Sequence, residues 1–113
     1  MALIVRSFNR PEWSPLPVKG SVGVEAKGLA RMERFNLAML KFEPNATIHE
    51  HPADIDIDVF CLEGEGMTSV KDQSAAIHAG EWVRWPAGQT HRLWTENSPM
   101  VLLMIEYFRP SSE

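Results

Sequence analysis

The sequence predicts a small all-β domain, either a sandwich or a barrel, with little helix. Turn signals interrupt β-branched and aromatic residues at short intervals: "EPNA" at 43–46, "EGEG" at 63–66, "KDQS" at 71–74, "PAG" at 86–88 and "ENSP" at 96–99. Aspartates and aliphatic residues alternate from Asp54 to Val59, as in a strand with one buried face. No stretch of ten or more residues shows helical apolar spacing. Short strands at regular spacing therefore define the fold class.

The length of 113 residues, of which 44% are hydrophobic, predicts one domain with one core. Residues 1–19 are predicted to form an extended arm, because Pro11, Pro15 and Pro17 make a poor helix and a poor central strand. The barrel domain is predicted to cover residues 20–113. Its last strand, Met100 to Phe108, is apolar on both faces and needs cover on both sides. We therefore expect a homodimer.

Composition limits the expected class of binding partner and the expected cellular compartment. The single cysteine, Cys61, permits no intrachain disulfide and favours a reducing compartment. The net charge is −4 and the basic residues are scattered, so nucleic acid is not an expected partner. The apolar run from Ala2 to Val5 ends at Arg6, short of a signal-peptide core or a membrane span. We expect a soluble, cytoplasmic protein that does not interact with membranes.

Histidines are the residues most suggestive of chemistry. His49 and His51 are two positions apart, so in a strand both side chains project to one face and can converge on a metal ion. Such pairs also occur on solvated faces. His78 precedes a predicted turn at Ala79-Gly80 and is expected at the surface. Cys61 is expected to be a small core residue without a chemical role.

A third histidine follows a specific pattern. Gly80, Pro86, Gly88 and His91 have the spacing of glycine, five residues, proline, one residue, glycine, two residues and histidine. This resembles the second motif of the cupin family. The asparagine usual four residues after that histidine is Thr95 here, which keeps a side chain able to hydrogen-bond.

The first cupin motif is matched at its ends only. His49-Glu50-His51 and Gly64 are present, but one residue too many lies between them. Counted forward the acidic position is Asp56, and counted back it is Ile57. A β-bulge would turn Asp56 inward, with Asp58 a weaker candidate for the same role. Without a bulge, alternation puts the aliphatics in the barrel and the aspartates in water, and both interpretations stay open.

The resemblance covers about residues 35–108 and implies a double-stranded β-helix, the jelly-roll barrel of cupins. It implies one divalent metal ion on His49, His51 and His91, with Asp56 as a tentative fourth ligand. Ligand type does not choose among zinc, iron, manganese, nickel and copper. A metal-free barrel, in which these histidines are surface or core residues, is the alternative.

The resemblance is to quercetinase-like dioxygenases and polyketide-synthesis cupins, which implies a small oxygenated substrate, aromatic or polyketide-like. Iron or nickel would suit a dioxygenase, and zinc or manganese an isomerase or cyclase. Tryptophans beside the third histidine are candidate pocket walls: Trp82, Trp85 and Trp94. Arg84 and Glu106 lie in otherwise apolar strands and are candidates to orient a polar substrate. A non-catalytic small-molecule-binding module is the alternative function.

Overall fold

The computed structural model describes residues 3–108, so the outermost parts of the predicted arm and barrel domain, 1–2 and 109–113, lie outside the described residues. The strands are β1 (Ser14–Pro15), β2 (Ser21–Arg31), β3 (Phe35–Pro52), β4 (Ile57–Val70), β5 (Gln73–His78), β6 (Trp82–Trp85), β7 (Thr90–Trp94) and β8 (Met100–Tyr107). The described chain contains no helix, and consequently none that could span a membrane. The all-β prediction is confirmed.

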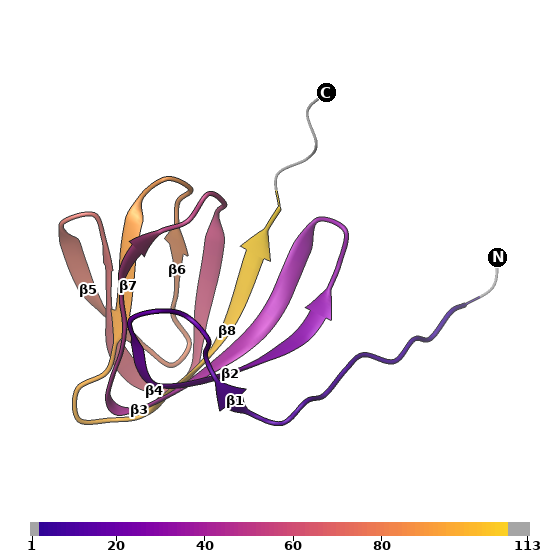
Figure 1. Cartoon of the computed structure of the whole chain (residues 1–113), viewed down its shortest axis with the longest axis horizontal. Coiled ribbons are helices and arrows are strands. Elements are labelled where there is room, and N and C mark those ends of the chain that lie inside the picture. Colours follow the sequence, from indigo (N-terminus) through magenta and orange to yellow (C-terminus); the bar gives the residue numbers. More distant parts are fainter. Residues whose placement is uncertain (1–2, 109–113) are drawn as a thin grey trace.

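The strand pairing closes into a barrel. β3 pairs with both β7 and β8, and β4 pairs with the same two strands, all antiparallel. Closure leaves these four strands without free edges. β2 and the short β1 extend the sheet beyond β3, while β5 and β6 both flank β4 (Figure 1). β3 and β4 are long, and each pairs with β7 along one part of its length and with β8 along another.

Alternating side chains of the barrel strands fill the interior. The largest fully buried side chains are Phe42, Leu40, Leu93, Met100, Leu102, His91 and Val59. Ile57, Val59 and Cys61 are buried in this core, so the predicted aliphatic face of β4 is confirmed. Asp58 on the opposite face is also buried, contrary to the expectation of a solvated aspartate. Arg84 and Tyr107 bind its carboxylate and cover it.

Gly64, the glycine of the first motif, is required by a close approach between strands. Its φ is +82°, a conformation that favours glycine. A Cβ atom at this position would lie 2.1 Å from the carbonyl oxygen of Pro99. The β4 backbone at Gly64 therefore lies so close to Pro99, just before β8, that any side chain at position 64 would clash.

Candidate functional site

Two of the predicted histidines meet inside the barrel. His51 near the end of β3 is paired in register with His91 of β7, and their rings lie edge to face with centroids 4.5 Å apart. On its other side the His91 ring stacks on Trp85, with centroids 4.1 Å apart and an angle of 9° between the planes. Trp85 is itself held by a bond from its indole N–H to the hydroxyl of Thr68. The His91 ring is thus fixed between two neighbours.

His91 is buried without a polar partner. It is 1% exposed, and neither ring nitrogen has a partner in hydrogen-bonding geometry. Burial, followed by the nearby His51 ring, lowers the pKa of His91 to about 4, and the Gln89 backbone offsets part of that shift. At neutral pH the ring is therefore uncharged, with one N–H donor and one lone pair. Buried polar atoms normally have partners, so this ring is poised to bind one.

His51 is oriented by the backbone. Its Nδ1 lies 2.8 Å from the carbonyl oxygen of His49, which can only accept a hydrogen bond. In the neutral ring Nδ1 therefore carries the hydrogen, and Nε2 has the lone pair. A fixed tautomer of this kind suits either a base or a metal ligand.

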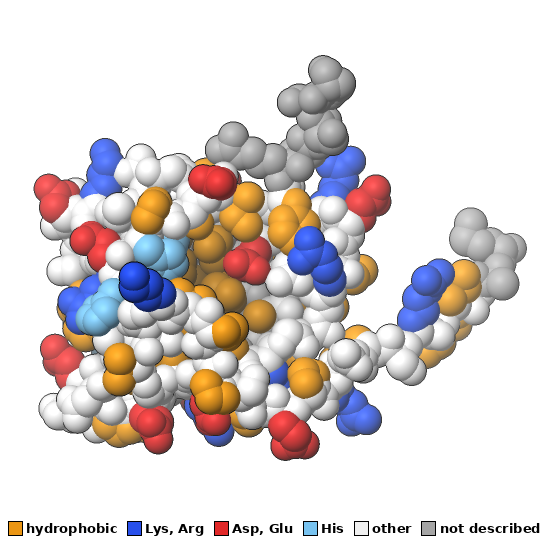
Figure 2. Space-filling model, in the orientation of Figure 1, with side chains coloured by type: hydrophobic (Ala, Val, Ile, Leu, Met, Phe, Trp, Pro, Cys, Tyr) orange, Lys and Arg blue, Asp and Glu red, His pale blue; other side chains and the backbone are white. Residues whose placement is uncertain are grey.

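Both histidines line a pocket of about 260 Å³ with mostly apolar walls. The lining residues are Leu16, Val18, Ala26, Ala38, Leu40, Ile48, His51, Ile57, Trp85, His91, Met104 and Glu106. Figure 2 shows this hollow, with hydrophobic side chains inside it and histidine and acidic side chains close by. An apolar pocket with a few polar groups is typical of a small-molecule site.

Glu106 is the third polar side chain of the pocket. It lies on β8, and the side-chain amide of Asn36 on β3 donates to its carboxylate at 3.1 Å. The sequence indicated Glu106 as a candidate to orient a polar substrate, and its place in the pocket lining agrees with that prediction. A signal was present: Glu106 shares the period-two face of Leu102 and Met104, which points into the barrel.

The structure does not bring His49 to this pocket. Between the pairs Ile48–Leu93 and His51–His91, β3 has two residues where β7 has one. This bulge breaks the alternation that was expected to put His49 and His51 on one face. His49 is exposed, with its ring beside Gly20 at the start of β2.

Asp56 also lies outside the pocket lining. Its carboxylate accepts a hydrogen bond from the backbone N–H of Ala87 at 2.8 Å and faces Arg84 at 3.8 Å. Across residues 3–108, no three or more histidine, cysteine, aspartate or glutamate side chains are arranged to hold a metal ion. The predicted three-histidine set, with or without Asp56, does not fit a metal in this structure. Metal binding stays a prediction.

Trp82, Trp94 and Arg84 contact other side chains and do not line the pocket. Trp82 is exposed and stacks on Phe60, while Trp94 is covered by Arg92, so of the three tryptophans Trp85 alone lines the pocket. Arg84 is bound to Asp58 through two hydrogen bonds, away from the pocket lining.

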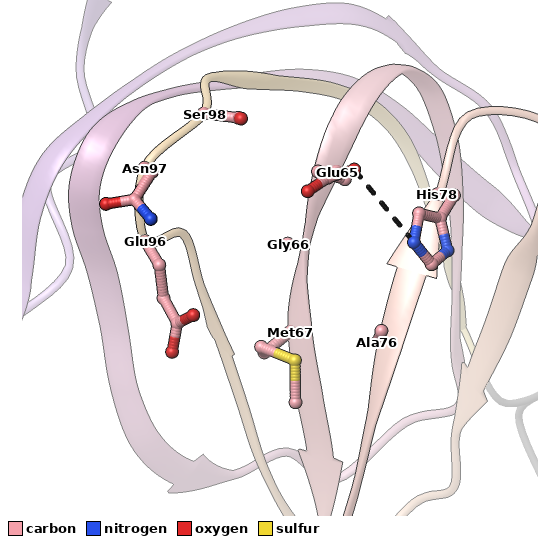
Figure 3. A pocket seen from close by; sticks show the side chains of 8 residues that line it. All are labelled: Glu65, Gly66, Met67, Ala76, His78, Glu96, Asn97 and Ser98. Carbon is pink, nitrogen blue, oxygen red and sulfur yellow. Dashed lines mark ion pairs between the residues drawn. The ribbon is translucent and has the colours of Figure 1, made fainter.

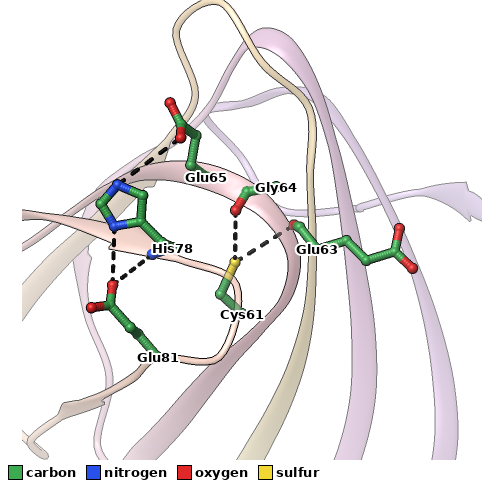
Figure 4. A network of polar contacts seen from close by, with 6 residues as sticks. All are labelled: Cys61, Glu63, Gly64, Glu65, His78 and Glu81. Atoms are coloured by element: carbon green, nitrogen blue, oxygen red, sulfur yellow. Dashed lines mark hydrogen bonds and ion pairs between the residues drawn. The ribbon is translucent and has the colours of Figure 1, made fainter.

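Cys61 and His78 agree with the predictions made for them. Cys61 is buried, and its thiol contacts the carbonyl oxygens of Glu63 and Gly64 (Figure 4). Burial raises the pKa of the thiol, which disfavours the reactive thiolate. His78 is exposed and contacts the carboxylates of Glu65 and Glu81. It borders a second pocket at the surface, lined by polar and small residues (Figure 3).

Comparison with known proteins assigns the class. The family model described as "Cupin domain" matches residues 38–106, and the chain belongs to this family. No curated protein matches the chain.

Solved structures share the fold over nearly the whole chain. The polyketide cyclase RemF from Streptomyces resistomycificus is 18% identical with a TM-score of 0.81, covering 96% of this chain and 81% of its own. KdgF from a Halomonas species is 15% identical with a TM-score of 0.79, covering 93% and 96%. A predicted oxalate decarboxylase from Thermotoga maritima is 20% identical with a TM-score of 0.74, covering 95% and 100%. At these identities the likeness extends to the fold alone.

Proposed function

We propose that the barrel pocket binds a small oxygenated organic molecule and that the protein is an isomerase or cyclase acting beside a carbonyl group. The observation that carries the proposal is the pair of unpartnered ring nitrogens of His91 in the apolar pocket. An unpaired buried donor or acceptor costs about 1–3 kcal/mol. A ligand oxygen that pairs with His91 removes this cost and is thereby favoured over an apolar ligand.

The three polar side chains have distinct roles in this proposal. The N–H of neutral His91 donates to the carbonyl oxygen of the ligand and stabilises the negative charge that grows there. The lone pair of His51 Nε2 or the carboxylate of Glu106 removes a proton from the adjacent carbon. The electron pair of that C–H bond moves to the carbonyl oxygen, giving an enol or enolate. Returning the proton to another carbon is isomerisation, and attack of the enolate carbon on a second carbonyl is cyclisation.

Metal-dependent dioxygenase chemistry is less well supported, because it depends on the predicted ligand set. His49 is exposed and Asp56 is engaged by Ala87, so only two of the predicted ligands face the pocket. No step of the proposed reaction passes through a metal ion. A polyketide cyclase among the proteins that share the fold is in keeping with carbonyl chemistry in such a barrel.

The test uses aromatic ketones such as 1-tetralone, with binding followed by the NMR signals of the histidine rings. We expect binding to shift the His51 and His91 signals, and the protein to speed deuterium uptake from D₂O at the carbon beside the carbonyl. His91→Gln should lose both effects, whereas His78→Gln should keep both. Ketone binding without deuterium uptake would favour the alternative, a non-catalytic binding module. Absence of binding would refute the proposal.

A further inference from the structure

The three polar side chains of the pocket do not converge on one point. His51, His91 and Glu106 all line it, yet within residues 3–108 no three histidine, cysteine, aspartate or glutamate side chains are arranged to hold a metal ion. The two histidine rings are neighbours, with centroids 4.5 Å apart. Glu106 is therefore set apart from the histidine pair, and the pocket has two separate polar ends.

Strand register gives the direction from one end to the other. On β4, Ile57 is paired with Trp85 of β6 on one side and with Glu106 of β8 on the other. Directly paired residues project to the same face of a sheet, and all three line the pocket. Two strand spacings put the backbones of Trp85 and Glu106 about 10 Å apart. Because the His91 ring stacks on Trp85, Glu106 lies at the opposite side of the pocket from His91.

The wall between the two polar ends is apolar. It includes Ile57 of β4, Met104 of β8 and Ala38 of β3. Met104 and Ala38 are paired in register, two residues before Glu106 on β8. The volume of about 260 Å³ is just below the usual range for ligand pockets, so it suits a ligand of one or two rings. Such a ligand would have an apolar ring system with a polar group at each end.

Glu106 can accept a hydrogen bond from the far end of this ligand. An ionised carboxylate is an acceptor with two oxygens, and the side-chain amide of Asn36 donates to one of them at 3.1 Å. The carboxylate keeps capacity for a second donor. A ligand donor at this end forms a charge-assisted hydrogen bond, which is about twice as strong as a bond between neutral groups.

A hydroxyl group suits this end of the pocket better than an ammonium group. A hydroxyl brings one donor, which the Glu106 carboxylate can satisfy. An ammonium brings three donors and a charge that has to leave water, and the apolar wall of Ile57, Met104 and Ala38 offers no side-chain acceptor for the other two. Burying unpaired donors of this kind is costly. The expected group is therefore a neutral hydroxyl.

We infer that the pocket selects aromatic ketones with a hydroxyl on the side of the ring away from the carbonyl, and that Glu106 is the specificity-determining residue that binds this hydroxyl. The inference rests on the proposed function, in which the ligand carbonyl lies at His91. It narrows the substrate class from oxygenated molecules in general to hydroxylated aromatic ketones with a defined spacing between the two oxygens.

Calorimetric titration of four ketones tests the spacing and the charge. The hydroxyl of 6-hydroxy-1-tetralone lies para to the ring carbon that bears the carbonyl group, whereas that of 8-hydroxy-1-tetralone lies beside the carbonyl and bonds to it internally. We expect the 6-hydroxy ketone to bind at least about tenfold more tightly than 1-tetralone, the value of one hydrogen bond to a charged group. The 8-hydroxy ketone should gain nothing. Equal affinities of 6-hydroxy-1-tetralone and 1-tetralone, or tighter binding of protonated 6-(aminomethyl)-1-tetralone, would overturn the inference.

Variants of Glu106 assign the preference to this residue. Glu106→Leu removes the acceptor with a side chain of similar size, and the affinity ratio of 6-hydroxy-1-tetralone to 1-tetralone should fall from about tenfold to about one. Glu106→Gln keeps a neutral acceptor oxygen and should give a ratio between these values, which also tests the inference if the leucine variant does not fold. The matched control is Glu63→Leu, at an exposed position of β4 outside the pocket lining, which should keep the full ratio.

The outcomes separate this inference from the proposed function. A full ratio in the Glu106 variants would overturn the inference alone, as would binding of 1-tetralone by the wild type with no preference for the 6-hydroxy ketone. Failure of the wild type to bind any of the ketones would refute the proposed function and the inference with it.

Discussion

The rings of His91 and Trp85 lie face to face, 4.1 Å apart, with the His91 nitrogens unpartnered inside the barrel. The proline turn after Trp85 joins β6 to β7 and brings the ring of Trp85 and the ring of His91 together. This contact covers one face of the imidazole and holds the ring in one orientation. The orientation of the ring determines where a ligand oxygen can bind to the His91 nitrogens.

Acid should destabilise the protein through His91. Its pKa is about 4 in the folded state, against about 6.5 in the unfolded chain. Between these two pH values His91 binds a proton in the unfolded chain but not in the folded protein. Stability should therefore fall as the pH drops from about 6.5 to 4, by up to about 3 kcal/mol. Urea titrations across this range should show a shallower dependence in His91→Gln, and equal slopes would contradict the assignment.

The carboxylate of Asp58 should stabilise the fold. It is 4% exposed and binds both Arg84 and Tyr107. Its pKa is lowered chiefly by the bond from Arg84, so this stabilisation is complete above pH 4 and is lost as the pH falls through the folded-state pKa. Because Arg84 is half exposed, Asp58→Ala should cost about 1–3 kcal/mol rather than the loss of a fully buried pair.

The control for Asp58 is the exposed Asp54 on the same segment. Asp54→Ala should change the free energy of unfolding by less than about 0.5 kcal/mol. Tyr107→Phe removes one of the bonds to Asp58 and should cost about 1 kcal/mol. Denaturant titration at pH 7 measures all three variants, and equal effects of Asp54→Ala and Asp58→Ala would show that the network is not stabilising.

Gly64→Ala should prevent stable folding or cost more than about 3 kcal/mol. An added Cβ would meet the Pro99 oxygen at 2.1 Å, in a backbone conformation that disfavours any side chain. Gly28→Ala is the matched control, since nothing lies within 4 Å of its Cβ position and its φ is ordinary. Thermal unfolding should leave Gly28→Ala close to wild type, and a comparable melting temperature for Gly64→Ala would contradict the close approach.

Substitution of His49 distinguishes the pocket described above from a site in which three histidines bind one metal ion. In the pocket described above, His49→Ala should leave ketone affinity unchanged, whereas His91→Ala should lower it by about tenfold, the equivalent of one hydrogen bond of about 1.4 kcal/mol. If all three histidines instead shared a metal ion, the two variants would have similar effects. Calorimetric titration with and without EDTA separates these outcomes.

Local sequence determined the class of fold and part of the site. Period-two alternation identified the buried face of β4, and the turn residues at 71–74, 86–88 and 96–99 marked strand ends, because these are properties of neighbouring residues. The turns predicted at 43–46 and 63–66 were wrong, since these residues lie inside the long strands β3 and β4. The spacing from Gly80 to His91 identified the family and placed His91 correctly inside the barrel. These features depend on a few consecutive residues and need no knowledge of distant contacts.

Only the tertiary structure decided which polar residues share the pocket. The bulge at His49 arises from pairing between β3 and β7, strands almost forty residues apart, so alternation along β3 alone could not reveal it. Glu106 joins His51 and His91 because β8 closes the barrel against β3. Asp58 is buried because Arg84 and Tyr107 arrive from two other strands. Each outcome is set by strand register, which long-range pairing determines and local sequence does not.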